Sequence, residues 1–144
     1  MATPTTGVRG ARLTQAAGWT ALTFGAVHML VTPWDTRAVW SAALSDGWWN
    51  SFTLNVSTTF AAAKQSEAFW LTLGSFGVPM ILTGALVVRA ARRDERVPEA
   101  IGWGTLAWGI LLTTSLPASP GWALPVIGGL LIAGDRLRRR AAGE

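Results

Sequence analysis

The chain contains no cysteine and no tyrosine, and only 14% of its 144 residues are charged. Without cysteine it can form neither disulfides nor thiolate metal sites. Soluble domains carry roughly 25% charged residues. The low charge content therefore predicts an integral membrane protein, or a chain buried in partners, and the 50% hydrophobic content excludes disorder.

Basic residues outnumber acidic ones, 12 against 8, and the isoelectric point is about 11.4. Such a balance can indicate nucleic-acid binding. Here, however, the arginines form short clusters between long uncharged stretches, and none falls on an amphipathic soluble element. We therefore expect no nucleic-acid partner.

Long uncharged stretches predict an all-α fold, specifically a polytopic membrane bundle of four helices. The clearest stretch, Ala68–Val88, has 21 residues and would cover roughly 30 Å as a helix. Residues 101–134 are 34 uncharged residues, which the turn residues 117–121 would divide into two short spans. A single broken span with re-entrant ends is the alternative. The expected spans are residues 13–31, 68–88, 101–116 and 119–134, within one membrane domain of residues 13–134.

The segment between the first two expected spans, residues 32–67, is too long for a simple loop. Residues 36–45 could form a short helix that lies along the membrane interface. Tryptophans are typical anchors at the headgroup level. The expected aromatic belt consists of Trp34, Trp40, Trp48, Trp49, Trp70 and Trp122.

The distribution of basic residues predicts the orientation of the chain. Only Arg37 and Lys64 fall on one side of the expected spans, whereas ten arginines fall on the other side. Both termini, residues 1–12 and the basic tail 135–144, should therefore lie in the cytoplasm, with the protein in a bacterial inner membrane. Cleavage of a signal peptide near residues 42–43 is the competing interpretation. The other side carries Arg9, Arg12, Arg89, Arg92, Arg93, Arg96, Arg136, Arg138, Arg139 and Arg140.

The single histidine is the main candidate for chemistry. Ala17, Ala21 and Gly25 precede His28 along roughly one helix face, and such small residues allow another helix to approach closely. His28 should therefore point into the bundle. It could be a ligand, a proton relay or a general base, or it could be a structural residue that bonds to a neighbour.

Three carboxylates could join His28 in an acid/base cluster at the outer face. The simpler interpretation of Glu67 is a boundary charge in a first helical turn, and that of Asp35 is a turn residue or cap. The complete set of catalytic candidates, for an enzyme, is His28, Asp35, Asp46 and Glu67.

Pro79 lies near the middle of an expected span, close to Gly77, and predicts a kink. One histidine and scattered carboxylates fall short of a metal site, and no glycine-rich phosphate loop is present. We expect no metal and no cofactor.

Short motifs along residues 13–134 resemble a family of small bacterial four-helix membrane proteins classed as a domain of unknown function. The resemblance supports the four-span topology and implies no catalytic residues. It is carried by Gly25-Ala26-Val27-His28, Gly47 with Asn50, Glu67-Ala68-Phe69-Trp70, Gly102-Trp103 and Pro117-Ala118-Ser119-Pro120-Gly121-Trp122.

These observations favour a non-enzymatic helical bundle that binds a lipid or a partner. Its expected partners are the lipid bilayer, a hydrophobic small molecule, or a homo- or hetero-oligomer. The first alternative is a small membrane enzyme that acts on an isoprenoid or lipid, with tryptophans stabilising a cationic intermediate. The second is an accessory subunit of a membrane complex.

Overall fold

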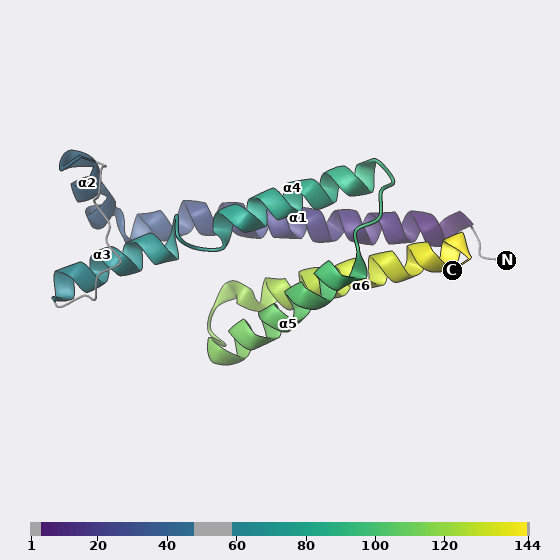
Figure 1. Cartoon of the computed structure of the whole chain (residues 1–144). Helices are drawn as coiled ribbons and strands as arrows, with labels where there is room; N and C mark the ends of the chain where they lie inside the picture. Colours follow the sequence, from purple (N-terminus) through teal and green to yellow (C-terminus); the bar gives the residue numbers. More distant parts are fainter. Residues whose placement is uncertain (1–3, 48–58, 144) are drawn as a thin grey trace. The chain divides into compact units, whose positions relative to one another are not determined.

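The computed structural model describes residues 4–47 and 59–143, and every regular element in them is helical (Figure 1). The prediction of an all-α fold is confirmed for these residues. The chain divides into two units, with unit 1 formed by Met1–Phe24 and Met80–Glu144 and unit 2 by Gly25–Pro79. The elements are α1 (Pro4–Asp35), α2 (Arg37–Ser45), α3 (Phe60–Leu71), α4 (Gly77–Arg92), α5 (Glu99–Ser115), the 3-10 helix η1 (Pro120–Trp122) and α6 (Ala123–Ala142).

In the described part of the chain, no helix combines the length and the apolar character that crossing a membrane requires. α5 carries no charge after Glu99 but has only 17 residues. α6 has 20 residues, but arginines and Asp135 occupy its second half. α1 is long, but Gln15, His28 and several threonines lower its apolar character. The prediction of a multi-pass protein of the bacterial inner membrane, with its termini assigned to the cytoplasm, is therefore wrong.

Unit 1 is built on close helix crossings at paired glycines. A Cβ on Gly84 of α4 would lie 2.7 Å from the carbonyl oxygen of Gly18 in α1. A Cβ on Gly10 of α1 would lie 2.8 Å from the carbonyl oxygen of Gly134 in α6. Because no side chain separates the backbones at these points, α4 and α6 each contact α1 closely.

α5 and α6 form an antiparallel hairpin with a third crossing of the same kind (Figure 1). A Cβ on Gly128 would lie 2.7 Å from the carbonyl oxygen of Gly102. α5 ends at Ser115 and η1 begins at Pro120. The turn between the two helices of the hairpin therefore overlaps residues 117–121, where the sequence predicts it. Ser119 caps η1 by accepting a hydrogen bond from the Gly121 N–H, and the Trp122 indole donates to the carbonyl of Pro117.

Unit 2 contains the short helix α2, which matches the helix expected over residues 36–45 to within one residue. α2 contacts α3. Trp48, Trp49 and Asn50 lie outside the described residues. The Thr59 side chain accepts a hydrogen bond from the Ala62 N–H and caps the start of α3.

The helix expected over Ala68–Val88 is interrupted between α3 and α4. The Thr72 hydroxyl donates to the carbonyl of Ala68 at 2.6 Å, and the Gly74 N–H donates to the carbonyl of Phe69. Pro79 is the third residue of α4. The N–H groups of the first helical turn have no partner within the helix, so a proline there removes no hydrogen bond. The proline therefore accompanies a helix start and not the expected kink.

Candidate binding groove

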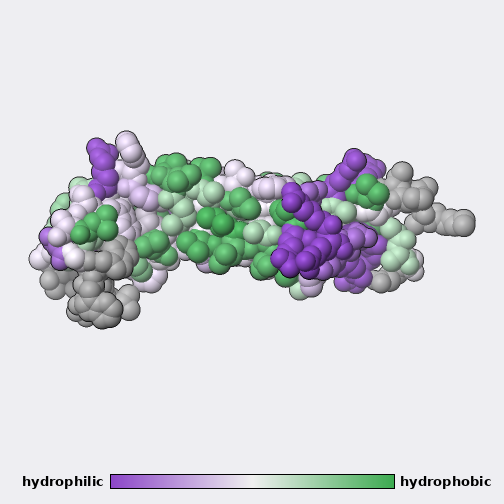
Figure 2. All heavy atoms as spheres, turned by 90° about the horizontal axis from the view of Figure 1, so that it is seen from above, coloured by the Kyte–Doolittle hydropathy of each residue, from purple (hydrophilic) through white to green (hydrophobic). Residues whose placement is uncertain are grey.

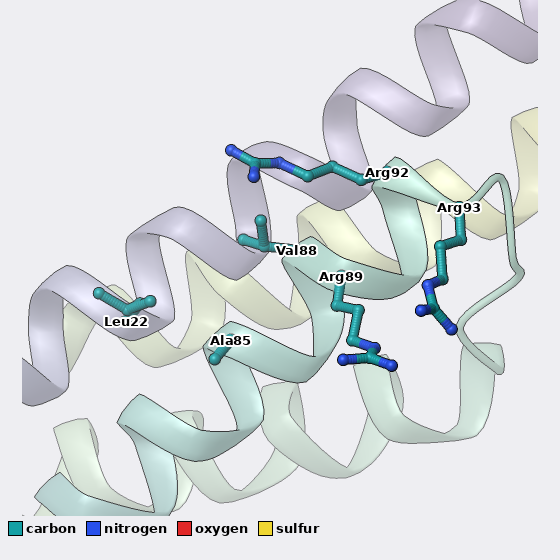
Figure 3. Close-up of a pocket in the computed structure, with 6 residues that line it drawn as sticks. All are labelled: Leu22, Ala85, Val88, Arg89, Arg92 and Arg93. Carbon is teal, nitrogen blue, oxygen red and sulfur yellow. The ribbon is translucent and has the colours of Figure 1, made fainter.

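A groove of about 430 Å³ lies between α1 and α4 in unit 1 (Figure 3). We call it the α1–α4 groove. Leu22 from α1 and Ala85 and Val88 from α4 form its apolar part. Arg89, Arg92 and Arg93 form its basic end.

The contact of α1 and α4 at Gly18 and Gly84 positions the groove. A Cβ on Gly84 would lie 2.5 Å from the Leu22 nitrogen, and a Cβ on Gly18 would lie 2.8 Å from Val88. Leu22 and Val88, which line the groove, therefore flank the point where the two backbones are closest. Along α4 the helical repeat then places Arg89 one turn after Ala85, and Arg92 one turn after Val88.

The three arginines differ in their partners. The Arg92 guanidinium lies 5.7 Å from the ring centroid of Trp19, within the range of a cation–π contact. Arg93 lies 4.0 Å from Glu95, and both side chains are more than half exposed, so this ion pair contributes little. Among the described residues, no carboxylate lies within ion-pair distance of Arg89.

Part of this basic charge stabilises the fold. Arg89 and Arg92 occupy the last turn of α4, where cations interact favourably with the helix dipole. The described part of unit 1 nevertheless holds ten arginines against four carboxylates. Figure 2 shows hydrophilic side chains gathered towards the right of the view, beside apolar surface. The excess of positive charge favours an anionic ligand.

Four arginines outside the groove have structural partners, namely Arg96, Arg136, Arg138 and Arg139. Asp135 of α6 is buried and accepts hydrogen bonds from Arg96, at 3.0 Å, and from Arg139, at 2.8 Å. Burial by itself would raise the pKa of Asp135, but the hydrogen bonds and charges of Arg139 and Arg96 outweigh it, so the pKa lies below its ordinary value.

Arg138 fixes the turn that follows α4. Its guanidinium donates to the carbonyls of Asp94 and Glu95 and to the Asp94 carboxylate. Asp94 has a left-handed backbone, with φ of 58°, at the end of a helix where glycine is usual. Arg138 thus holds the backbone of the turn that follows α4, while Arg136 pairs with Glu99 at 2.8 Å.

The proposed catalytic residues all lie in unit 2. The His28 ring stacks on Phe76 with centroids 4.9 Å apart, and its Nε2 is buried without a hydrogen-bond partner among the described residues. Asp35, Asp46 and Glu67 are exposed. In the described part of the chain, no hydrogen bond or ion pair joins any of these carboxylates to His28.

The remaining sequence candidates are divided between buried and exposed positions. Ala17, Ala21, Gly25 and Gly77 are buried, and Gly77 contacts Met29 of α1. Trp34, Trp70 and Trp122 are exposed, while Trp40 is half-buried and its indole donates to Thr36. In the described residues, no cluster of histidine and carboxylates could hold a metal ion.

The sequence interpretation overlooked the groove because it used Arg89, Arg92 and Arg93 to predict the orientation of the chain and not a binding site. A usable signal was present. The four-residue spacing from Ala85 to Arg89 and from Val88 to Arg92 places an apolar residue and an arginine on the same helix face.

A family of unknown function, DUF6463, matches residues 12–138, close to the extent of the resemblance drawn from the motifs. No curated protein and no solved structure gives a significant match.

Proposed function

We propose that this chain, which belongs to the DUF6463 family of unknown function, is a non-enzymatic binding protein for an anionic amphiphile such as a lipid. The α1–α4 groove would take a phosphate or carboxylate headgroup at Arg89 and Arg93. It would take the adjoining hydrocarbon on Leu22, Ala85 and Val88. The observation that carries the proposal is this junction of apolar and basic surface in one groove.

The chemistry of the lining residues supports binding of an anion. Arginine presents a planar set of donors that matches phosphate and carboxylate, and such bonds are stronger than neutral hydrogen bonds. Arg89 is exposed and has no competing carboxylate among the described residues. Hydrocarbon buried on the apolar part contributes about 0.8 kcal/mol per methylene. A volume of 430 Å³ is within the range of small-molecule sites.

The same lining argues against catalysis in the groove. None of its six lining residues is a carboxylate, a histidine or a hydroxyl residue, so the groove offers no general base or nucleophile. The enzymatic alternative depends on His28, whose candidate carboxylates are exposed. We therefore propose a binding role.

Calorimetric titration of the full chain with three probes tests the proposal. The probes are n-decyl phosphate, n-decyl glucoside and inorganic phosphate, each kept below its critical micelle concentration where it has one. We expect decyl phosphate to bind at least about 10-fold more tightly than either other probe, because only it uses both parts of the groove. Equal binding of the phosphate and glucoside amphiphiles would show that the arginines do not select the ligand.

A further inference from the structure

α5 presents a broad apolar face on the side opposite its contact with α6. Gly102, Gly109 and Thr113 are buried towards α6. On the remaining surface, large side chains expose between 40% and 67% of their area. We call this surface the outer face of α5, formed by Ile101, Trp103, Gly104, Ala107, Trp108, Ile110 and Leu111.

The polar groups of α5 do not interrupt this face. The hydroxyls of Thr105, Thr114 and Ser115 each donate to a carbonyl one turn earlier in the same helix. Beyond Glu99 the helix carries no charged side chain. A helix that is apolar all round is normally buried on all sides. The apolar character of the outer face is therefore typical of a surface that packs against another apolar surface.

Gly104 supports close packing against this face. A Cβ at Gly104 would meet no atom within 4 Å, whereas Gly102 and Gly109 are each in tight contact with α6. Gly104 thus leaves the outer face without a side chain near its centre, and a second helix can approach closely there.

We propose that the occupant is a second copy of this chain, packed against the outer face of α5 in an antiparallel two-fold dimer. The five large side chains expose on the order of 500 Å² together. Ala107 and the neighbouring exposed Leu116 extend this area towards the roughly 800 Å² that a standard interface takes from each partner. The residues that form the face are uncharged, and an arginine lies against it only at its beginning, where the Arg136 guanidinium is 5.6 Å from the Trp103 ring centroid.

Charge favours the antiparallel orientation. The beginning of α5 lies beside the arginines of α6, as the Arg136–Glu99 pair shows. A parallel dimer would bring two such basic ends together. In an antiparallel dimer the ends lie about one helix length apart, roughly 25 Å for 17 residues. This separation exceeds the Debye length of about 8 Å at physiological salt.

Sedimentation velocity on the full chain without added ligand tests the dimer. We expect a dimer for the unchanged protein and at least about a 10-fold weaker association for Leu111→Glu. The matched control is Leu86→Glu on α4, since Leu86 is equally exposed at 66% and lies outside the α5 face. A monomeric unchanged protein, or equal loss in both variants, would overturn the proposal.

Two further variants keep the test valid if Leu111→Glu fails to fold. A Cβ at Gly104 meets nothing within 4 Å, so Gly104→Leu should fold and still weaken the dimer. A Cβ at Gly129 on α6 is equally free of contacts, and Gly129→Leu should leave the dimer intact. Because the chain lacks cysteine, Ala107→Cys gives an unambiguous crosslink. Ala107 is the middle residue of α5, so it should crosslink to its own copy, and Gly129→Cys should not. A crosslink at Gly129→Cys alone would contradict the assigned face.

Discussion

Gly18 and Gly84 bring α1 and α4 into backbone contact, since a Cβ on Gly84 would lie only 2.7 Å from the Gly18 carbonyl oxygen. Leu22 and Val88 flank this contact, and both line the α1–α4 groove. The shape of the groove therefore depends on a position where no side chain fits.

Gly84→Ala should lower the free energy of unfolding by about 2–3 kcal/mol, because the added methyl group forces the two backbones apart. The control is Gly129→Ala, whose Cβ meets nothing within 4 Å. That variant should gain about 0.5–1 kcal/mol from helix propensity. Chemical denaturation of both variants measures the difference, and a stable Gly84→Ala protein would contradict the close crossing.

Asp135→Asn should destabilise the protein by about 1–3 kcal/mol, because it removes the charged acceptor shared by Arg96 and Arg139. Glu99→Gln is the control, since it breaks the more exposed pair with Arg136 and should cost less than about 1 kcal/mol. Equal costs in denaturation experiments would show that burial of Asp135 adds nothing to its ion pairs.

The stability that Asp135 contributes should depend on pH. Its pKa is lowered in the folded state, below the ordinary value of 3.8. The contribution is therefore fully present above the unfolded pKa and is lost as the pH falls through the folded pKa. The difference in unfolding free energy between the unchanged protein and Asp135→Asn should be constant from pH 7 to about 5 and should shrink below pH 4. A difference that grew on acidification would have the wrong sign.

His28→Phe should leave stability unchanged or raise it by up to about 1 kcal/mol, because it removes a buried nitrogen without a described partner and keeps a ring against Phe76. His28→Ala should cost about 2–3 kcal/mol through the lost ring contact. Thermal unfolding compares the two variants. A large loss in His28→Phe would reveal an essential polar partner of His28.

Several elements of the fold followed from local sequence signals. The turn at residues 117–121 was readable from its two prolines, and α2 was expected because the segment of residues 32–67 is too long for a simple loop. The break between Leu71 and Gly77 was not readable, because an uncharged run looks continuous and the turn there is closed by backbone hydrogen bonds, from the Thr72 and Gly74 N–H groups to the Phe69 carbonyl.

The membrane prediction failed because an uncharged run reports neither the length of each helix nor the charged residues that belong to the same helix. The 34 uncharged residues from Ile101 are split between α5 and the first half of α6, and Asp135 and the arginines that follow it belong to the same helix as that half. The partners of Asp135 were only partly predictable. Arg139 lies four residues away on one helix, but Arg96 reaches it from 39 residues away in the sequence.

Binding of n-decyl phosphate to paired arginine variants tests the central claim most directly. Arg89→Gln combined with Arg93→Gln removes two positive charges from the groove. Arg9→Gln combined with Arg140→Gln removes two exposed charges that do not line it. We predict at least about a 10-fold weaker affinity for the groove variant and less than about a 3-fold change for the control. Equal weakening in both would mean that net charge alone attracts the amphiphile, which would contradict a binding site in the α1–α4 groove.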